Sequence, residues 1–168
     1  MTLRRRHETD DGWREAVYSD CEAYRYALTV HWAEGPRLLY VMLNPSKATE
    51  LANDPTIERC ERRARQLGYG SVGVVNLFGL RETSPARLKA ARAPEGSGNM
   101  AEIEAAVAAS DHVLAAWGVH GAHQNQCDSF AKRLRAFGKP LFHLGLTKHG
   151  HPRHPLYISY EIPLQPWV

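Results

Sequence analysis

The sequence predicts an α/β domain of three layers, in which helices cover both faces of a mostly parallel central sheet with an antiparallel hairpin at its edge. Two observations predict this class. Short continuous apolar runs, typical of strands buried on both faces, alternate with segments whose apolar residues recur at helical spacing. Capping residues or prolines precede several of these segments, and glycines follow some of them. Strands that alternate with helices favour parallel pairing.

The first two strands are expected to form the edge hairpin. Residues 1–20 are polar and are expected to be irregular. Over 23–32, apolar residues alternate with polar or small ones, which is typical of a half-buried strand. A Glu-Gly-Pro turn at 34–36 separates this strand from the apolar run at 37–43. We therefore expect 23–32 to pair antiparallel with 37–43 and to lie at the edge of the sheet.

Helices and strands alternate after this hairpin. Asp54 followed by Pro55 predicts the start of a helix, because Asp is a good N-cap and proline is favoured at the first helical position. Gly68 or Gly70 ends this helix. The further expected elements are a strand over 72–75, a short helix capped by Ser84-Pro85, a helix opened by a capping box of Asn99 and Glu102, a strand over 112–117, a helix over 122–137 and a strand over 141–144.

Length and composition limit the possible classes of protein. A chain of 168 residues with 43% hydrophobic positions predicts one domain over residues 1–168. Without an apolar run of about 18 residues, we expect neither a transmembrane span nor a membrane partner. An apolar stretch does not follow the basic N-terminus, which argues against a secretory signal. The three cysteines are far apart, which argues against a CxxC site and favours a reducing cytoplasm.

Polar and aromatic residues follow the predicted parallel strands. In open α/β sheets, ligands bind beyond the carboxyl ends of the strands, so these residues are expected to converge on one site. They are Asn44-Pro45-Ser46 after the strand at 37–43, Asn76-Leu77-Phe78 after 72–75, Trp117-Gly118 after 112–116, and the stretch from Lys148 to Pro155 after 141–144.

Two amides and one carboxylate are candidates for chemistry at this site. Asn44, beside the rigid Pro45, can orient a water or a substrate hydroxyl, because an amide both donates and accepts. Asn76 can bind the edge of a base in the way that amides bind adenine. Each asparagine can equally cap a turn. Asp54 has a structural explanation as an N-cap, and polarising a water is the alternative.

One histidine near the C-terminus is a candidate for transition-state stabilisation. Pro155 restricts the backbone of His154, so the imidazole can be fixed toward a developing anion on a leaving group; a surface-loop histidine is the alternative. His149 and His151 lie nearby, but the interrupted spacing, without a neighbouring carboxylate, argues against a metal site. We therefore expect neither a metal nor another cofactor.

Side chains that suit a nucleic-acid ligand are also present. Arg59 and Arg63 are four residues apart on one helix and can meet phosphates together, although a solvated helix face explains them as well. Trp117 can stack on a base or sugar, with packing in the core as the alternative. The net charge of +3 does not by itself indicate nucleic-acid binding.

Five segments in order resemble an uncharacterised family of bacterial and phage proteins that is known only as a domain of unknown function. The resemblance covers roughly residues 17–158 and implies a family without an activity. The segments are Val-Met-Leu-Asn-Pro-Ser at 41–46, Asn-Asp-Pro-Thr-Ile at 53–57, Val-Asn-Leu-Phe at 75–78, Ala-Trp-Gly at 116–118 and Pro-Arg-His-Pro-Leu-Tyr at 152–157.

More remotely, the chain is similar to the uracil-DNA glycosylase superfamily. Asn44-Pro45, Asn76 and His154-Pro155 stand in the order of its functional blocks. The resemblance implies a three-layer sandwich with a parallel sheet. It also implies that Asn44 positions the attacking water, Asn76 recognises the base and His154 stabilises the leaving base. Met42-Leu43 and Ser46 stand in place of that superfamily's glycines, so uracil itself is not carried over as the substrate.

The leading hypothesis is an N-glycosidic hydrolase acting on a flipped, modified or damaged base in DNA. The alternatives are a non-catalytic nucleic-acid or nucleotide-binding domain with a degenerate pocket, and a hydrolase of a free nucleotide or nucleoside derivative. The expected residues are Asn44, His154 and Asp54 for catalysis, Pro45, Ser46, Asn76, Phe78, Trp117 and Gly118 for the base or substrate, and Arg59, Arg63, Lys148 and Arg153 for phosphates.

Overall fold

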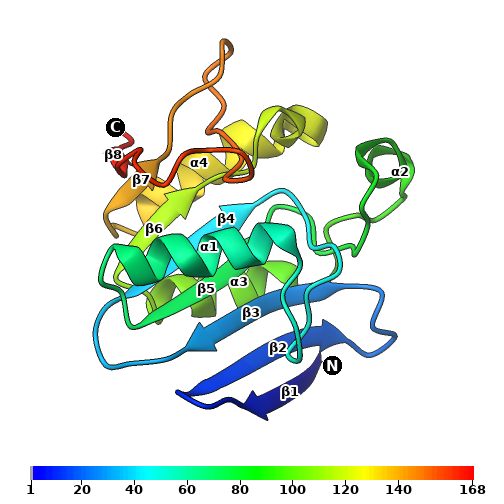
Figure 1. Ribbon diagram of the computed structural model, residues 1–168. Helices are drawn as coiled ribbons and strands as arrows, with labels where there is room; N and C mark the ends of the chain where they lie inside the picture. The colour runs from blue at the N-terminus through cyan, green and yellow to red at the C-terminus, as the bar shows by residue number, and fades with distance from the viewer. Residues whose placement is uncertain (1) are drawn as a thin grey trace.

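A mixed eight-stranded sheet forms the centre of the protein (Figure 1). The structure is a computed structural model that describes residues 2–168, without the side chains of residues 122 and 124–126. The strands lie side by side in the order β1-β2-β3-β5-β4-β6-β7-β8. Their bounds are β1 (Thr2–Glu8), β2 (Trp13–Ser19), β3 (Arg25–His31), β4 (Arg37–Met42), β5 (Ser71–Asn76), β6 (His112–Ala115), β7 (Leu141–His143) and β8 (Gln165–Pro166).

Helices cover both faces of this sheet (Figure 1). α1 (Pro55–Gln66) packs on one face, and α3 (Asn99–Ala108) and α4 (Gln126–Ala136) pack on the other. α2 (Pro85–Ala90) is short and stands away from the sheet, and the 3₁₀ helix η1 (Val119–Asn125) leads into α4. Within the described residues, no helix is both long and apolar enough to cross a membrane.

The alternation of side chains along β4 divides the core into two halves. Successive residues of a strand point to opposite faces of its sheet. Leu38 and Tyr40 therefore pack toward Ile57 on the α1 side, whereas Leu39 and Val41 pack on the side of α3 and α4. Every residue of β4 after the first is at most 4% exposed, which agrees with the expected burial of this strand on both faces.

The prediction of a mostly parallel sheet like that of the glycosylase superfamily is wrong. Only the pairs β4–β5, β4–β6 and β6–β7 are parallel, and the other pairs are antiparallel. Residues 1–20, expected to be irregular, form β1 and β2 instead. β1 escaped prediction because it is a charged edge strand: its arginines face solvent and pair with Glu15, Glu22 and Glu102.

The predicted hairpin is also wrong, because β5 lies between its two strands. Leu28 of β3 and Tyr40 of β4 both pair with Val74, so β3 lies inside the sheet. The turn between β3 and β4 wraps around Gly70, whose oxygen accepts hydrogen bonds from Trp32 and Ala33. A Cβ at Gly70 would lie 2.4 Å from the oxygen of Ala33, so glycine is needed for β5 to enter there.

Two of the predicted helix starts have different outcomes. Asp54 caps α1 as expected, because its Oδ1 accepts a hydrogen bond from Ile57 N at 2.9 Å. The capping box expected at Asn99 does not form. Gly98 is the N-cap of α3, and the buried Asn99 amide instead donates to the backbone oxygens of Asn76 and Leu77. The helix expected over 122–137 begins as η1 and becomes α-helical at Gln126.

Two arginines of α1 hold the C-terminal segment against the helix. Arg63 is 1% exposed and donates to Ile158 O at 2.9 Å and to Ser159 O at 3.1 Å. Arg59 also donates to Ile158 O, and its guanidinium lies 4.4 Å from the centre of the Tyr160 ring. These two cations are therefore bound within the protein.

We expect Arg63→Met to lower the free energy of unfolding by about 3 kcal/mol, because it leaves buried carbonyls without their charged donor. Chemical denaturation measures this loss. The matched control is Arg62→Met, since Arg62 is exposed and has only a long pair with Glu58 at 3.6 Å. The control should change stability by less than about 0.5 kcal/mol. Equal losses in the two variants would contradict the anchoring role.

Candidate functional site

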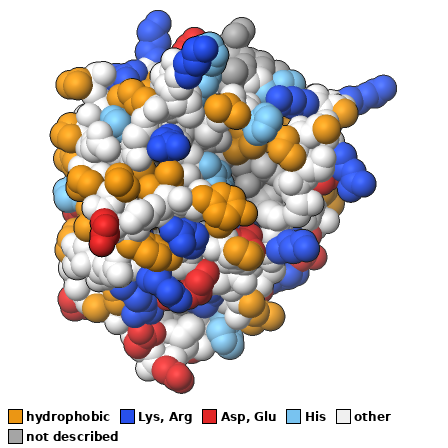
Figure 2. All heavy atoms as spheres, turned by 45° about the horizontal axis from the view of Figure 1, so that its top comes forward, with side chains coloured by type: hydrophobic (Ala, Val, Ile, Leu, Met, Phe, Trp, Pro, Cys, Tyr) orange, Lys and Arg blue, Asp and Glu red, His pale blue; other side chains and the backbone are white. Residues whose placement is uncertain are grey.

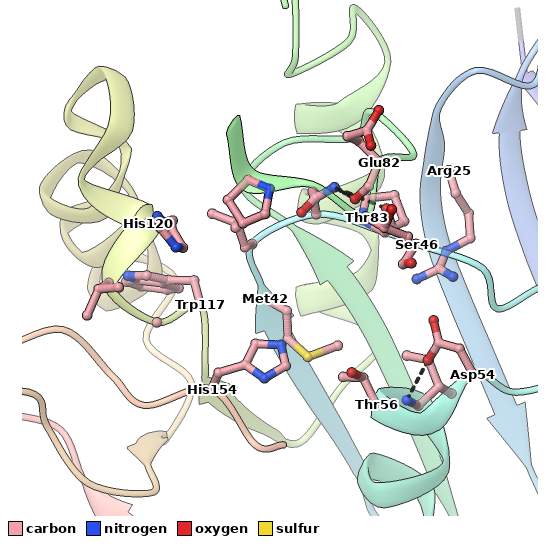
Figure 3. Close-up of a pocket in the computed structure, with 17 residues that line it drawn as sticks. Arg25, Met42, Ser46, Asp54, Thr56, Glu82, Thr83, Trp117, His120 and His154 are labelled. Carbon is pink, nitrogen blue, oxygen red and sulfur yellow. Dashed lines mark hydrogen bonds between the residues drawn. The ribbon is translucent and has the colours of Figure 1, made fainter. Parts of the chain in front are cut away.

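A pocket of about 360 Å³ opens beyond the carboxyl ends of β4 and β6 (Figure 3). Its walls come from segments that are distant in the sequence: the start of β3, the loop after β4, the first turn of α1, the loop before α2, the residues after β6, and the loop that carries His154. Parallel strands bring their carboxyl ends to one edge of a sheet, so the central parallel strands create this pocket although the outer strands are antiparallel.

Most of the residues expected to carry catalysis or bind the substrate line this pocket. They are Asn44, Pro45, Ser46, Asp54, Trp117, Gly118 and His154. Figure 3 shows Trp117 and His120 at one end and Arg25, Ser46 and Asp54 at the other, with His154 and Met42 between them. A single ligand can therefore contact an aromatic end, a central imidazole and a polar end.

Asn76 and Phe78 lie outside the pocket. Both are fully buried, and Asn76 occupies the end of β5 beneath the surface. The side-chain oxygen and nitrogen of Asn76 have no hydrogen-bond partner among the described residues. Phe78 packs in the core with its ring 5.6 Å from that of His123. In this conformation neither side chain contacts a ligand in the pocket.

The four residues expected to bind phosphates fall into two pairs. Arg59 and Arg63 are occupied by the backbone of the C-terminal segment. Lys148 and Arg153 are exposed in the loop after β7 and lie outside the residues that line the pocket. Only the second pair is free to meet a large ligand at the surface.

Asn44 connects the loop after β4 to the loop before α2. Its Nδ2 donates to the backbone oxygens of Pro45, Leu80 and Glu82, at 3.1, 3.1 and 2.6 Å. Three carbonyl acceptors around one nitrogen fix the orientation of the amide. Its Oδ1 accepts no hydrogen bond from the residues that the structure describes, so it remains an acceptor for a water or a ligand.

Asp54 joins the loop after β4 to the first turn of α1. Its Oδ1 accepts from Ile57 N, and its Oδ2 accepts from Lys47 N at 3.3 Å and Ala48 N at 3.2 Å. A carboxylate has about four acceptor positions, so three are used by backbone N–H groups. The negative charge is thereby held at a fixed place in the pocket wall.

His154 presents an N–H group to the pocket. Its Nδ1 accepts a hydrogen bond from Leu156 N at 3.2 Å, which places the proton of the neutral ring on Nε2. Burial lowers the pKa of His154, while the charge of Asp54 acts in the opposite direction. The imidazole is therefore neutral at neutral pH, and its free Nε2–H is a hydrogen-bond donor.

Gly118 allows the loop that carries His154 to lie close to the residues that follow β6. Its φ of +74° is in the left-handed region, which favours glycine, and its N–H donates to Pro152 O at 2.8 Å. Trp117 beside it is 1% exposed and donates from Nε1 to Cys127 Sγ at 3.1 Å. Trp117 thus offers little exposed surface to the pocket, and its proposed stacking on a base stays a prediction.

Sequence reasoning missed five polar residues that line the pocket: Arg25, Thr56, Glu82, Thr83 and His120. Arg25 stands at the start of a strand that otherwise alternates apolar with polar or small residues. Its charge there was the sequence signal that could have marked it as a candidate site residue. Burial, helped by the charge of Lys89, lowers the pKa of His120. Glu82 accepts from Ser84 N at 3.1 Å, which is a local turn contact.

The described residues contain no cluster of three or more histidine, cysteine or acidic side chains that could hold a metal ion. His151 instead has its Nδ1 3.1 Å from Cys127 Sγ, and His154 has its Nδ1 bound to the backbone. The residues that line the pocket supply amide, carboxylate, hydroxyl, imidazole and guanidinium groups.

Comparison with known proteins gives a family and no activity. No curated protein and no solved structure matches the chain, so similarity to the uracil-DNA glycosylase superfamily is not shown. A family described as "Protein of unknown function (DUF1643)" matches residues 25–156. This match covers most of the chain and confirms the resemblance to a domain of unknown function. The chain belongs to the DUF1643 family.

Proposed function

We propose that the protein is an N-glycosidic hydrolase that takes a flipped, modified or damaged base of DNA into this pocket. The observation that carries the proposal is the position of the neutral His154, with a free Nε2–H, beside Asn44 and Asp54 in one cavity. A volume of about 360 Å³ is at the lower end of the range for small-molecule sites, which suits one base with its sugar.

The reaction breaks the bond between C1′ of the sugar and the base nitrogen. The bonding electron pair leaves with the base, and positive charge develops on the sugar. The Nε2–H of His154 donates a hydrogen bond to the departing base, which stabilises the negative charge that forms there. Water adds its oxygen to C1′ and loses a proton, and the released base takes up one proton, so the reaction is balanced.

Asn44 and Asp54 support the other half of the reaction. The Oδ1 of Asn44 accepts a hydrogen bond from the attacking water, because its Nδ2 is already held by three carbonyls. The carboxylate of Asp54 is held by three backbone N–H groups, which fix its position in the pocket wall. Asp54 therefore acts through its charge, by stabilising the positive sugar.

A specific observation favours the free nucleotide as a second candidate substrate. Arg59 and Arg63 are bound within the protein and do not extend to a DNA backbone. In Figure 2, Lys and Arg side chains are scattered among hydrophobic and acidic side chains on the visible face. DNA recognition depends on several phosphate contacts, whereas a small nucleotide needs only those inside the pocket.

The first test of this proposal is base release. Duplexes carrying a panel of modified bases, and the corresponding free nucleotides, are incubated with the protein, and abasic sites or free bases are measured. We expect release by the wild-type protein and a loss of about 10²-fold or more in rate in His154→Ala, because a donor to the developing anion is removed.

The matched control for His154→Ala is His149→Ala, an exposed histidine of the same loop outside the pocket lining. Its rate should equal that of the wild-type protein. Equal rates for His154→Ala and wild type would exclude the proposed role of His154. Tight binding of base-containing ligands without any release would indicate the non-catalytic binding domain instead.

The second test is the protonation state of His154, measured by ¹⁵N NMR over a pH titration. We expect the proton of the neutral ring on Nε2 and a midpoint below the ordinary pKa of 6.5, because burial disfavours the charged form. The unfolded chain then binds more protons than the native protein below pH 6.5, so this histidine lowers the free energy of unfolding as the pH falls through that range.

Asp54→Asn provides an internal control for this titration. Asparagine is as good an N-cap as aspartate, so α1 should be retained. Loss of the carboxylate removes a charge that raises the pKa of His154, and the midpoint should move further down. A proton on Nδ1, or a midpoint above 6.5 in the wild-type protein, would contradict the assignment of His154 as a neutral Nε2–H donor.

A further inference from the structure

A buried cation lies in the polar end of the pocket. Arg25, the first residue of β3, is 1% exposed and lines the cavity with its guanidinium on the side of Ser46 and Asp54 (Figure 3). Its Nη1 donates to Ala48 O at 2.8 Å, its Nε is buried without a partner, and its Nη2 has no hydrogen-bond partner among the described residues. Arg25 therefore has unused donor capacity.

The charge of Arg25 also lacks a carboxylate partner within the described residues. Burial lowers its pKa to about 10, so the guanidinium remains charged at neutral pH. The negative charge of Asp54 acts on Arg25, but its oxygens are bound by backbone N–H groups, and the two side chains form no ion pair within the described residues. A buried charge without a pair is costly to a folded protein, which favours a bound ligand here.

Further donors converge on the same end of the pocket. The hydroxyls of Ser46 and Thr56 line the cavity and have no hydrogen-bond partner among the residues that the structure describes. In the first turn of α1, Pro55 has no N–H and the N–H of Ile57 is capped by Asp54, so the N–H of Thr56 is left as a free donor. The positive end of a twelve-residue helix adds to the charge of Arg25.

The carboxylates that line the pocket leave room for an anion beside Arg25. Asp54 is bound by three backbone N–H groups, and Glu82 accepts from Ser84 N and pairs with Arg87 at 3.9 Å. Within the described residues, neither carboxylate forms a hydrogen bond or an ion pair with the guanidinium of Arg25. A tetrahedral oxyanion has several oxygens, so one group can accept from the guanidinium, the two hydroxyls and the helix N–H together.

We propose that Arg25, Ser46 and the first turn of α1 at Thr56 form an oxyanion subsite that binds the phosphoryl group of the substrate. The inference rests on the proposed function, since it places the base toward His120 and Trp117, the glycosidic bond beside His154, and the phosphoryl group at Arg25. The phosphoryl group belongs either to a free nucleoside monophosphate or to the DNA backbone, and the chemistry at the subsite is the same for both.

The experiment is a calorimetric titration with inorganic phosphate, nucleosides, the matching nucleoside 5′-monophosphates and a short DNA duplex. We expect phosphate to bind the wild-type protein and a monophosphate to bind at least tenfold more tightly than its nucleoside. Arg25→Met and Thr56→Val should each weaken phosphate and monophosphate binding tenfold or more. Thr56→Val keeps the side-chain shape and tests the subsite even if Arg25→Met fails to fold.

Thr29→Val is the matched control, because Thr29 is a threonine of β3 outside the residues that line this pocket. It should bind phosphate as the wild-type protein does. Loss of monophosphate binding in the Thr56 variant supports the subsite with a free nucleotide as the source. If the Thr56 variant loses only duplex binding, the result supports the subsite with the phosphate of the DNA backbone as its ligand.

Two results would overturn the subsite. One is a wild-type protein that does not distinguish a monophosphate from its nucleoside and binds both phosphate and the duplex no more tightly than the Thr56 variant does. The other is a folded Thr56→Val protein that binds every ligand as tightly as wild type. Base release does not enter this titration, so failure of hydrolysis and failure of the subsite are separate results.

Discussion

The site depends on one carboxylate that three backbone N–H groups hold in place. Asp54 begins α1 through Ile57 N and fixes the loop after β4 through Lys47 N and Ala48 N. The carbonyl of Ala48 in turn accepts from the buried Arg25, so this contact also orients the guanidinium. Loss of the whole side chain, as in Asp54→Ala, would release the helix start, the loop and the cation together, because each is positioned through the same few atoms.

The amide of Asn44 extends this arrangement to another wall of the pocket. Asn44 ties the same loop to the backbone of Leu80 and Glu82, and the loop of His154 approaches through the N–H of Gly118. The polar groups that face the ligand are thus supported by backbone hydrogen bonds from several segments. Such support keeps donors and acceptors in place before the substrate arrives, which is the condition for electrostatic stabilisation of a transition state.

The sequence predicted the buried central strands and most of the residues that line the pocket, because both follow from local patterns. Apolar runs marked β4 and β5, and the residues after β4 and β6 pointed to the pocket. The edge strand β1 and the order of the central strands were not predictable in this way. β1 is charged, and the insertion of β5 between β3 and β4 depends on tertiary contacts at Gly70. The burial of Arg25 was not predictable from local sequence either, because it arises from packing between distant segments.

The decisive experiment is a crystal structure with a nucleoside monophosphate that carries a non-hydrolysable glycosidic linkage. We expect the base to lie within hydrogen-bond distance of His154 Nε2 and the phosphoryl oxygens to contact Arg25 and the first turn of α1. A ligand bound elsewhere while this pocket stays empty would contradict this expectation, as would a ligand in the pocket with its phosphate turned to the solvent.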